Sequence, residues 1–122
     1  MATVAVVGAS VNRRKYGNRA VRAFVQQGYH VIPVNPHETV VEGLPAVASL
    51  ADIHEPIDII TVYVPPAIGI GLLDAMAAAG AKEVWLNPGA ESDALVANAR
   101  SLGIEPIQAC SIMGVGLSQE EF

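Results

Sequence analysis

Residues 3–10 read TVAVVGAS, an uninterrupted apolar run that ends in three small residues. The valine-rich part, Thr3 to Val7, predicts a buried β-strand, and Gly8 predicts the tight turn that follows it. Gly17 comes at the start of the helix predicted next. Because a strand, a small-residue turn and a helix follow one another here, the chain begins as the first unit of an α/β domain.

The same unit recurs along the chain. Runs rich in Val, Ile and aromatic residues predict further strands over Tyr29 to Val34, Asp58 to Val64, Glu83 to Leu86 and Glu105 to Gln108. Helical spacing of apolar residues occurs between the strands, within residues 20–25, 72–77 and 95–102. The residues expected to end these helices in the left-handed conformation are Gly28, Gly80 and Gly103.

Strands that are apolar on both faces and alternate with helices belong to a parallel sheet covered on both sides. We therefore predict an α/β, doubly wound Rossmann-like fold of about five parallel strands, with helices on both faces, as a single domain over residues 1–122. Residues 37–56 fit this pattern least well and predict an irregular crossover. The tail from Ser118 to Phe122 predicts a frayed acidic end.

Composition restricts the class of protein. The chain has 122 residues, of which 52 % are apolar and 16 % charged, with a formal net charge of −5. This balance argues against a nucleic-acid-binding protein with an extended basic surface. A single cysteine, no secretory signal pattern and no apolar run near the ~20 residues that span a bilayer predict a cytoplasmic protein without a membrane segment.

The positive charge is concentrated in one place. Five of the seven Lys and Arg residues lie close together, namely Arg13, Arg14, Lys15, Arg19 and Arg22, and no carboxylate precedes Glu38. Cations placed where a strand passes into a helix favour a phosphate, because the backbone N–H groups and the helix dipole there also favour negative charge. For Arg19 and Arg22 a solvated helix face is an equal alternative, since they lie three residues apart.

The glycine spacing fits neither the dinucleotide fingerprint nor a nucleoside-triphosphate loop. An NAD domain usually places Asp or Glu at the end of the second strand to hold the ribose hydroxyls. Here that stretch is Val34-Asn35-Pro36-His37, which tolerates a phosphate on the ribose. The residues therefore favour NADP or coenzyme A over NAD, and His37, which follows the second strand, is a candidate contact to ribose or phosphate.

Four stretches carry a family resemblance. They are VVGAS at 6–10, KYG at 15–17, GYHVIPVNP at 28–36 and VWLNPG at 84–89. Together they resemble the stand-alone CoA-binding domain proteins, which are similar to the nucleotide-binding domain of the succinyl-CoA synthetase α subunit. The resemblance covers nearly the whole chain and implies a Rossmann-like sheet that holds CoA across the carboxyl ends of its strands.

The resemblance also implies site residues. The phosphates would be cradled by Gly8, Ala9, Ser10, Asn12, Tyr16 and Gly17, with charge from Arg13, Arg14 and Lys15. The adenosine end would be bordered by Val34, Asn35 and Pro36, and the cleft beside it by Tyr63, Val64 and Pro65. Many relatives carry Gln where Asn87 stands, which makes Asn87 the expected but altered pantetheine contact. Cys110 follows the fifth strand, where the related synthetases also have a cysteine near the CoA cleft.

The sequence contains no recognisable catalytic constellation or metal motif. His30, His37 and His54 lack the spacing of metal ligands, and Ser10 is not in a hydrolase motif. A lone Cys110 is more often a buried hydrophobe than a nucleophile, and a reversible mixed disulfide with CoA is the less demanding hypothesis. The synthetases need a phosphohistidine domain and a partner subunit, so ligase activity is not implied by this chain alone.

The leading prediction is a small CoA-binding or acyl-CoA-binding protein that does not turn its ligand over, with no nucleic-acid or membrane partner. One alternative is an enzyme component, either NADP-dependent or CoA-ligase-related, that acts with a partner chain. Another is a regulatory scaffold with a degenerate ligand site. A protein partner or a homo-oligomer stays open.

Overall fold

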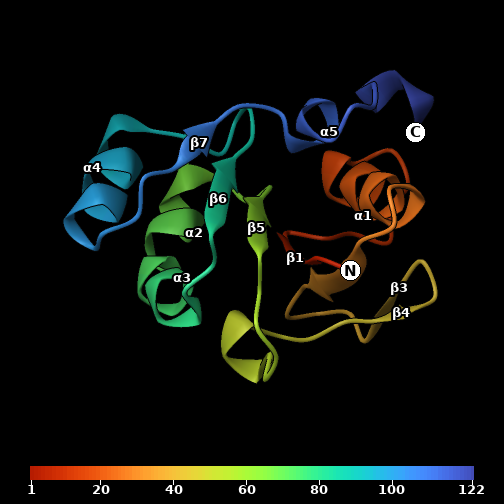
Figure 1. Ribbon diagram of the computed structural model, residues 1–122, viewed down its shortest axis with the longest axis horizontal. Helices are drawn as coiled ribbons and strands as arrows, with labels where there is room; N and C mark the ends of the chain where they lie inside the picture. Colours follow the sequence, from red (N-terminus) through yellow and green to blue (C-terminus); the bar gives the residue numbers. More distant parts are fainter.

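The computed structural model describes the backbone of residues 1–122 and every side chain apart from that of Gln119. Its central sheet contains β1 (Thr3–Val7), β2 (His30–Val34), β5 (Ile59–Val62), β6 (Glu83–Leu86) and β7 (Ile107–Gln108). These strands are parallel and lie in the order β2-β1-β5-β6-β7 (Figure 1). The predicted doubly wound fold is confirmed, and the direction of strand addition reverses between β1 and β5.

Helices cover both faces of the sheet. They are α1 (Tyr16–Gln26), α2 (Pro66–Ile70), α3 (Leu73–Ala79), α4 (Asp93–Ser101) and α5 (Ser111–Gly114). In Figure 1, α1 and α5 lie on one side of the sheet and α2, α3 and α4 on the other. Among the described residues no helix has the length and apolar character needed to cross a membrane.

The first strand is apolar on both faces because each face meets a separate core. Val4 and Val6 pack in the cluster that contains Phe24 of α1, whereas Ala5 packs in the cluster that contains Leu95 of α4. All of these side chains are at most 1 % exposed. Burial of apolar surface on both sides, at roughly 25 cal/mol per Å², is the main force that holds the helices to the sheet.

Several predicted boundaries need correction. The strand predicted over Asp58 to Val64 is restricted to Ile59–Val62, and the one predicted over Glu105 to Gln108 to its last two residues. The helix predicted within residues 72–77 is preceded by a separate short helix, α2, which begins at Pro66. Gly28, Gly80 and Gly103 have φ values of 84°, 64° and 83°, so the predicted left-handed helix ends are confirmed.

Residues 37–56 contain a small hairpin that the sequence did not predict. Strands β3 (Val40–Val41) and β4 (Leu44–Pro45) pair antiparallel across a turn at Glu42 and Gly43, and a 3₁₀ turn, η1 (Leu50–Asp52), follows. Strands of two residues are too short for periodicity to register. Glu-Gly is also not one of the residue pairs that favour a two-residue hairpin turn, so the turn at Glu42 and Gly43 could not be recognised as that of a hairpin.

The tail is ordered against the domain, contrary to the prediction of a frayed end. A 3₁₀ turn, η2 (Gln119–Glu121), precedes Phe122, whose main-chain oxygen accepts a hydrogen bond of 3.0 Å from Arg22 Nη2. The Arg22 guanidinium also lies 5.7 Å from the centre of the Phe122 ring. Two contacts to one arginine of α1 therefore fix the end of the described chain.

Main-chain segments from three parts of the fold lie close together at the turn after β1. Gly8 has a φ of +89°, and a Cβ atom on it would lie 3.0 Å from Val64 Cγ1 and 3.1 Å from the carbonyl carbon of Tyr63. A Cβ atom on Gly17 would overlap the Gly8 carbonyl oxygen and lie 3.0 Å from its carbonyl carbon. Both glycines are needed because α1, β1 and the end of β5 approach one another through bare main chain.

We predict that Gly17→Ala destabilises the protein by about 2–3 kcal/mol, because the added methyl group must displace backbone rather than a flexible side chain. The measurement is the free energy of unfolding in urea, with Gly69→Ala as the control. Gly69 is buried in α2, but its nearest neighbour would be Leu95 Cδ2 at 3.5 Å, an ordinary contact. The control should be neutral or slightly stabilising, and equal effects of the two substitutions would contradict the steric explanation.

Candidate functional site

A cleft of about 590 Å³ opens at the carboxyl ends of the strands, beside the point where the strand order reverses. It is lined by Gly8, Ala9, Ser10, Lys15, Tyr16, Gly17, Asn35, Tyr63, Val64, Pro65, Asn87, Pro88, Gly89, Ala90 and Cys110. In open α/β sheets ligands bind in this crevice, because the chain leaves the two central strands toward opposite faces. The volume lies within the range of small-molecule and cofactor sites.

The glycine turn forms one wall and is fixed by main-chain contacts. Gly8 N–H donates to Val34 O at 3.1 Å, and the Asn35 side-chain amide donates to Ala9 O at 2.7 Å. The Asn35 carbonyl in turn accepts from His37 N–H at 2.7 Å. Asn35 thus lines the cleft while its amide ties the end of β2 to the turn after β1.

The predicted cations are not all in the cleft. Lys15 lines it at the start of α1, and Arg14 is exposed outside it. Arg13 lies 3.4 Å from a carboxylate oxygen of Glu42, and Arg19 lies 5.0 Å from the centre of the Tyr16 ring. Of the five clustered cations, Lys15 alone is among the residues that line the cleft, and Arg13, Arg19 and Arg22 contact other parts of the protein.

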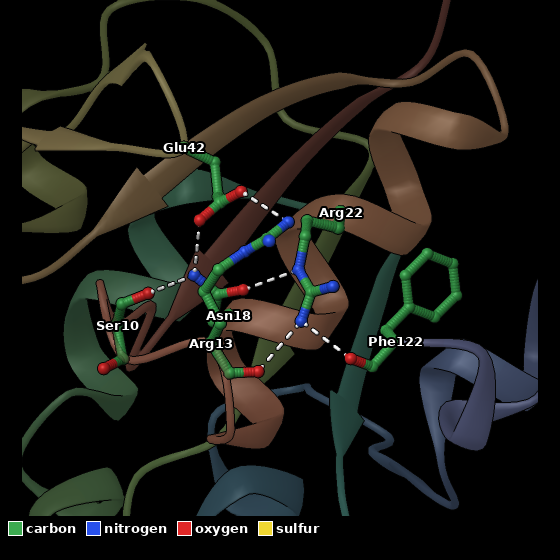
Figure 2. Close-up of polar contacts among 6 residues, drawn as sticks. All are labelled: Ser10, Arg13, Asn18, Arg22, Glu42 and Phe122. Atoms are coloured by element: carbon green, nitrogen blue, oxygen red, sulfur yellow. Dashed lines mark hydrogen bonds and ion pairs between the residues drawn. The ribbon is translucent and has the colours of Figure 1, made fainter.

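Arg22 has neither of the roles proposed from sequence. Its Nε donates to Asn18 Oδ1 at 2.7 Å and its Nη2 donates to the main-chain oxygen of Arg13 at 2.9 Å (Figure 2). Burial lowers the pKa of its guanidinium from the usual value, with a further lowering by the Arg13 charge. The side chain joins α1 to the loop that precedes it, so it is neither a solvated stripe nor a residue of the cleft wall.

A buried polar network forms the floor between β5, β6 and α5. Thr61 Oγ1 and Ser111 Oγ lie 2.8 Å apart, and the Tyr63 hydroxyl lies 3.1 Å from the same serine oxygen. Asn87 Nδ2 donates to Thr61 Oγ1 at 2.7 Å and to Val62 O at 2.9 Å, while its Oδ1 accepts from Ser111 N–H at 2.8 Å. The network joins strands that are distant in sequence at the edge where the cleft opens.

Asn87 is 1 % exposed, and both of its amide hydrogens and its carbonyl oxygen are used in this network. Because every polar atom of the Asn87 amide already has a partner in the protein, this side chain shapes the cleft by holding Ser111 against β5 and β6. The cleft wall after β6 continues through Pro88, Gly89 and Ala90, which the sequence analysis did not select. Their position directly after a strand, at the carboxyl edge of the sheet, is the sequence feature that could have identified them as cleft residues.

Cys110 also lines the cleft, immediately before α5. The indole ring of Trp85 packs on α5, since a Cβ atom on Gly114 would lie 2.6 Å from Trp85 Cη2. Trp85 Nε1 donates to a Glu83 carboxylate oxygen at 3.1 Å. The helix that follows Cys110 is thus held by Trp85 at Gly114 and by Asn87 at Ser111.

Of the other predicted residues, Asn12, Arg13, Arg14, Val34 and Pro36 are not among the cleft-lining residues. Val34 is 6 % exposed and packs in the core, whereas Pro36 and Asn12 lie on the surface. Asn12 Oδ1 accepts from Arg14 N–H at 3.0 Å and so shapes the loop itself. Within the described part of the chain, no group of three His, Cys, Asp or Glu side chains is arranged to hold a metal ion.

The fold and the cleft define a class, the doubly wound α/β domains that have a ligand crevice at the reversal of strand order. Residues 2–116 match the CoA binding domain family, and the chain belongs to that family. The relation to the stand-alone CoA-binding domain proteins, predicted from four sequence stretches, is confirmed by this match.

Solved structures agree with the family. The chain is 32 % identical to a conserved hypothetical protein from Pyrococcus furiosus, with a TM-score of 0.85 over 93 % of this chain and 99 % of that one. It is also similar to part of acetyl-coenzyme A synthetase 1 of Ca. Korarchaeum cryptofilum, at 28 % identity and a TM-score of 0.73, over 84 % of this chain and 24 % of that one. The family is thus related to domains of CoA ligases.

A curated relative matches over a shorter stretch. The uncharacterized protein YneT of Bacillus subtilis (strain 168) is 40 % identical over 60 residues. This alignment covers 49 % of the chain and 44 % of the length of YneT.

Tyr63 gives a pH-dependent test of the network. Burial raises the pKa of the Tyr63 hydroxyl from 10.0 to about 12, although its hydrogen bond to Ser111 opposes the rise. Below pH 10 both the folded and the unfolded states carry a neutral hydroxyl. Between pH 10 and about 12 only the unfolded state ionises, so stability that is fully present below pH 10 should be lost across this interval, by about 2 kcal/mol.

The check is the free energy of unfolding measured at intervals from pH 8 to 12 for the parent protein and for Tyr63→Phe. The variant lacks the ionising group and should lose less stability than the parent as the pH rises. Tyr16→Phe is the control, because that ring is 50 % exposed and the substitution preserves its face toward Arg19. Parallel curves for the parent and Tyr63→Phe would show that the hydroxyl is not buried as described.

Proposed function

We propose that this protein binds CoA or an acyl-CoA in the cleft and holds it without turning it over. The observation that carries the proposal is the cleft itself, which a CoA-binding-family chain forms at the reversal of strand order from the Gly8 turn, Gly17 and Lys15. A bare glycine backbone lets phosphate oxygens approach closely, and Lys15 adds a positive charge at the positive end of the α1 dipole.

The proposed orientation follows the resemblance described from the sequence. The phosphates lie against residues 8–10 and 15–17, the adenosine end toward Asn35, and the pantetheine arm along residues 87–90 toward Cys110. The lining is mixed, since apolar Val64, Pro65 and Ala90 lie in it together with polar side chains, and this mixture suits a ligand that has charged phosphates and a less polar arm. A reversible mixed disulfide, formed when the Cys110 thiolate attacks CoA disulfide and releases one CoA thiol, stays a prediction.

The residues that line the cleft support binding rather than turnover. Among the described lining residues the titratable side chains are Lys15, Tyr16, Tyr63 and Cys110, and none is His, Asp or Glu. General acid–base catalysis needs a group with a pKa near the working pH. The raised pKa of Tyr63, about 12, keeps that hydroxyl protonated at neutral pH.

Two alternative functions decide which other ligands have to be tested beside CoA. The first is NADP binding, because no carboxylate follows β2. The second is a component that acts with a partner chain, because this chain corresponds to only 24 % of the acetyl-coenzyme A synthetase 1 that it resembles. Calorimetry at fixed salt with CoA, acetyl-CoA, NADP, NAD and ATP separates these functions. We expect binding of CoA or acetyl-CoA in preference to the others; a response to NADP alone would contradict the proposal, and no response to any of them would favour a scaffold.

Lys15→Ala should weaken CoA binding about tenfold or more, because a hydrogen bond to a charged group contributes roughly 1.5–3 kcal/mol. Lys82→Ala is the matched control, since it removes the same charge from a side chain that is 82 % exposed and paired with Asp58 at 3.5 Å, outside the cleft. Isothermal titration of both variants with CoA is the measurement. Equal affinities of the two variants would remove Lys15 from the site.

A further inference from the structure

A buried asparagine outside the cleft holds the loop of residues 10–15, which connects the Gly8 turn to α1. Asn18, on the first turn of α1, is fully buried at 0 % exposure. Its Nδ2 donates to the main-chain oxygen of Ser10 at 2.8 Å and to Glu42 Oε2 at 3.0 Å, and its Oδ1 accepts from Arg22 Nε at 2.7 Å. Figure 2 shows this amide between the loop, the hairpin turn and Arg22.

The partners allow only one orientation of the Asn18 amide. Ser10 O and the Glu42 carboxylate are acceptors, so the NH₂ group must face them. The Arg22 guanidinium is a donor, so the carbonyl oxygen must face it. The Asn18 amide nitrogen therefore binds both Glu42 and the main-chain oxygen of Ser10. It connects the position of Glu42 to that of Ser10, which lines the cleft.

Glu42 occupies an unfavourable backbone position for its residue type. It has a φ of +50° in the turn between β3 and β4, where Asn, Asp or Gly is the usual choice. Its side chain uses both oxygens, since Oε2 accepts from Asn18 and Oε1 lies 3.4 Å from Arg13 Nη2. A residue held in a rare conformation points to a role for the side chain, because the turn alone would favour a different residue.

The loop is held at two main-chain oxygens. Asn18 holds the oxygen of Ser10, and Arg22 Nη2 holds that of Arg13 at 2.9 Å. The loop's own hydrogen bonds centre on Asn12, which donates to Ser10 Oγ at 3.0 Å and accepts from the N–H groups of Arg14 and Lys15, each at 3.0 Å. The loop leads directly into Lys15, so its shape sets where Ser10 and Lys15 stand in the cleft.

We propose that Glu42 and Asn18 are positioning residues for the ligand, and that the β3–β4 hairpin holds residues 10–15 in the conformation that binds the phosphates. The hairpin contributes no residue to the cleft wall and acts on the cleft through the Asn18 amide. This inference rests on the proposed function for the identity of the ligand, but the ordering of the loop by the hairpin is testable without any ligand.

Trypsin gives that ligand-free test, because three successive cleavage positions lie in the loop, at Arg13, Arg14 and Lys15. Cleavage of a folded protein reports how often a segment opens locally. In Glu42→Asn the shorter side chain suits the left-handed turn but no longer reaches Asn18. We expect unchanged thermal stability to within a few degrees and cleavage at 13–15 about tenfold faster than in the parent, equivalent to ~1.4 kcal/mol of local opening.

Two further variants make the test specific. Glu42→Gln keeps the length and one acceptor oxygen for Asn18, so it should restore most of the protection. Asp74→Asn removes the same charge from an exposed position on α3, on the opposite face of the sheet, and should match the parent. The proposal is overturned if Glu42→Asn is cleaved at the parent rate, if Glu42→Gln is cleaved as fast as Glu42→Asn, or if faster cleavage also occurs at Lys82 and Arg100.

Calorimetry with CoA on the same variants completes the test. Glu42→Asn should bind CoA about tenfold more weakly than the parent, and Glu42→Gln should bind it nearly as well as the parent. If Glu42 only stabilised the fold, a variant with unchanged thermal stability would keep the affinity of the parent. Parent affinity in Glu42→Asn, despite a loosened loop, would overturn the positioning role. If the parent itself binds no CoA, the proposed function fails, whereas the trypsin result still decides whether the hairpin orders the loop.

Discussion

The main chain at Gly8 lies between two other stretches of main chain, and the site depends on that contact. On one side is Gly17 at the start of α1, and on the other are Tyr63 and Val64 at the end of β5. No side chain fits on Gly8 or Gly17, so the three elements approach as bare backbone. This approach brings the start of a helix to the reversal of strand order, where the chain leaves an open crevice between neighbouring strand ends.

The clustered positive charge serves more than one purpose once the chain is folded. Lys15 reaches the cleft, while Arg13 and Arg22 bind a carboxylate and main-chain oxygens that belong to the loop and to the end of the described chain. One cluster of cations thus contains both a residue that lines the cleft and residues that hold the loop in place. The two kinds are indistinguishable in a count of charges along the sequence, because the carboxylate partner Glu42 lies after β2.

The strands of the sheet and the left-handed glycines could be predicted because each has a local signal, whereas most of the cleft wall was predicted from the resemblance to the CoA-binding domain proteins. Valine-rich runs, glycines after helices and small residues after strands are readable within a few positions. The hairpin at residues 40–45 was missed because its strands have two residues each and its turn begins with an atypical Glu42. The hydrogen bonds of Asn87 and Asn18 could not be predicted for another reason. Asn87 binds Thr61 and Ser111, Asn18 binds Glu42, and each of these partners is 24 or more positions away in the sequence.

The packing of Trp85 on Gly114 has a practical consequence. Trp85 is the single tryptophan of the chain, and its ring contacts the helix that follows the cleft residue Cys110. Indole emission is sensitive to the polarity and proximity of surrounding groups, and here those groups include the main chain of α5 and the Glu83 carboxylate. The domain therefore contains its own fluorophore packed against α5, and its emission can report movement of that helix without any added dye.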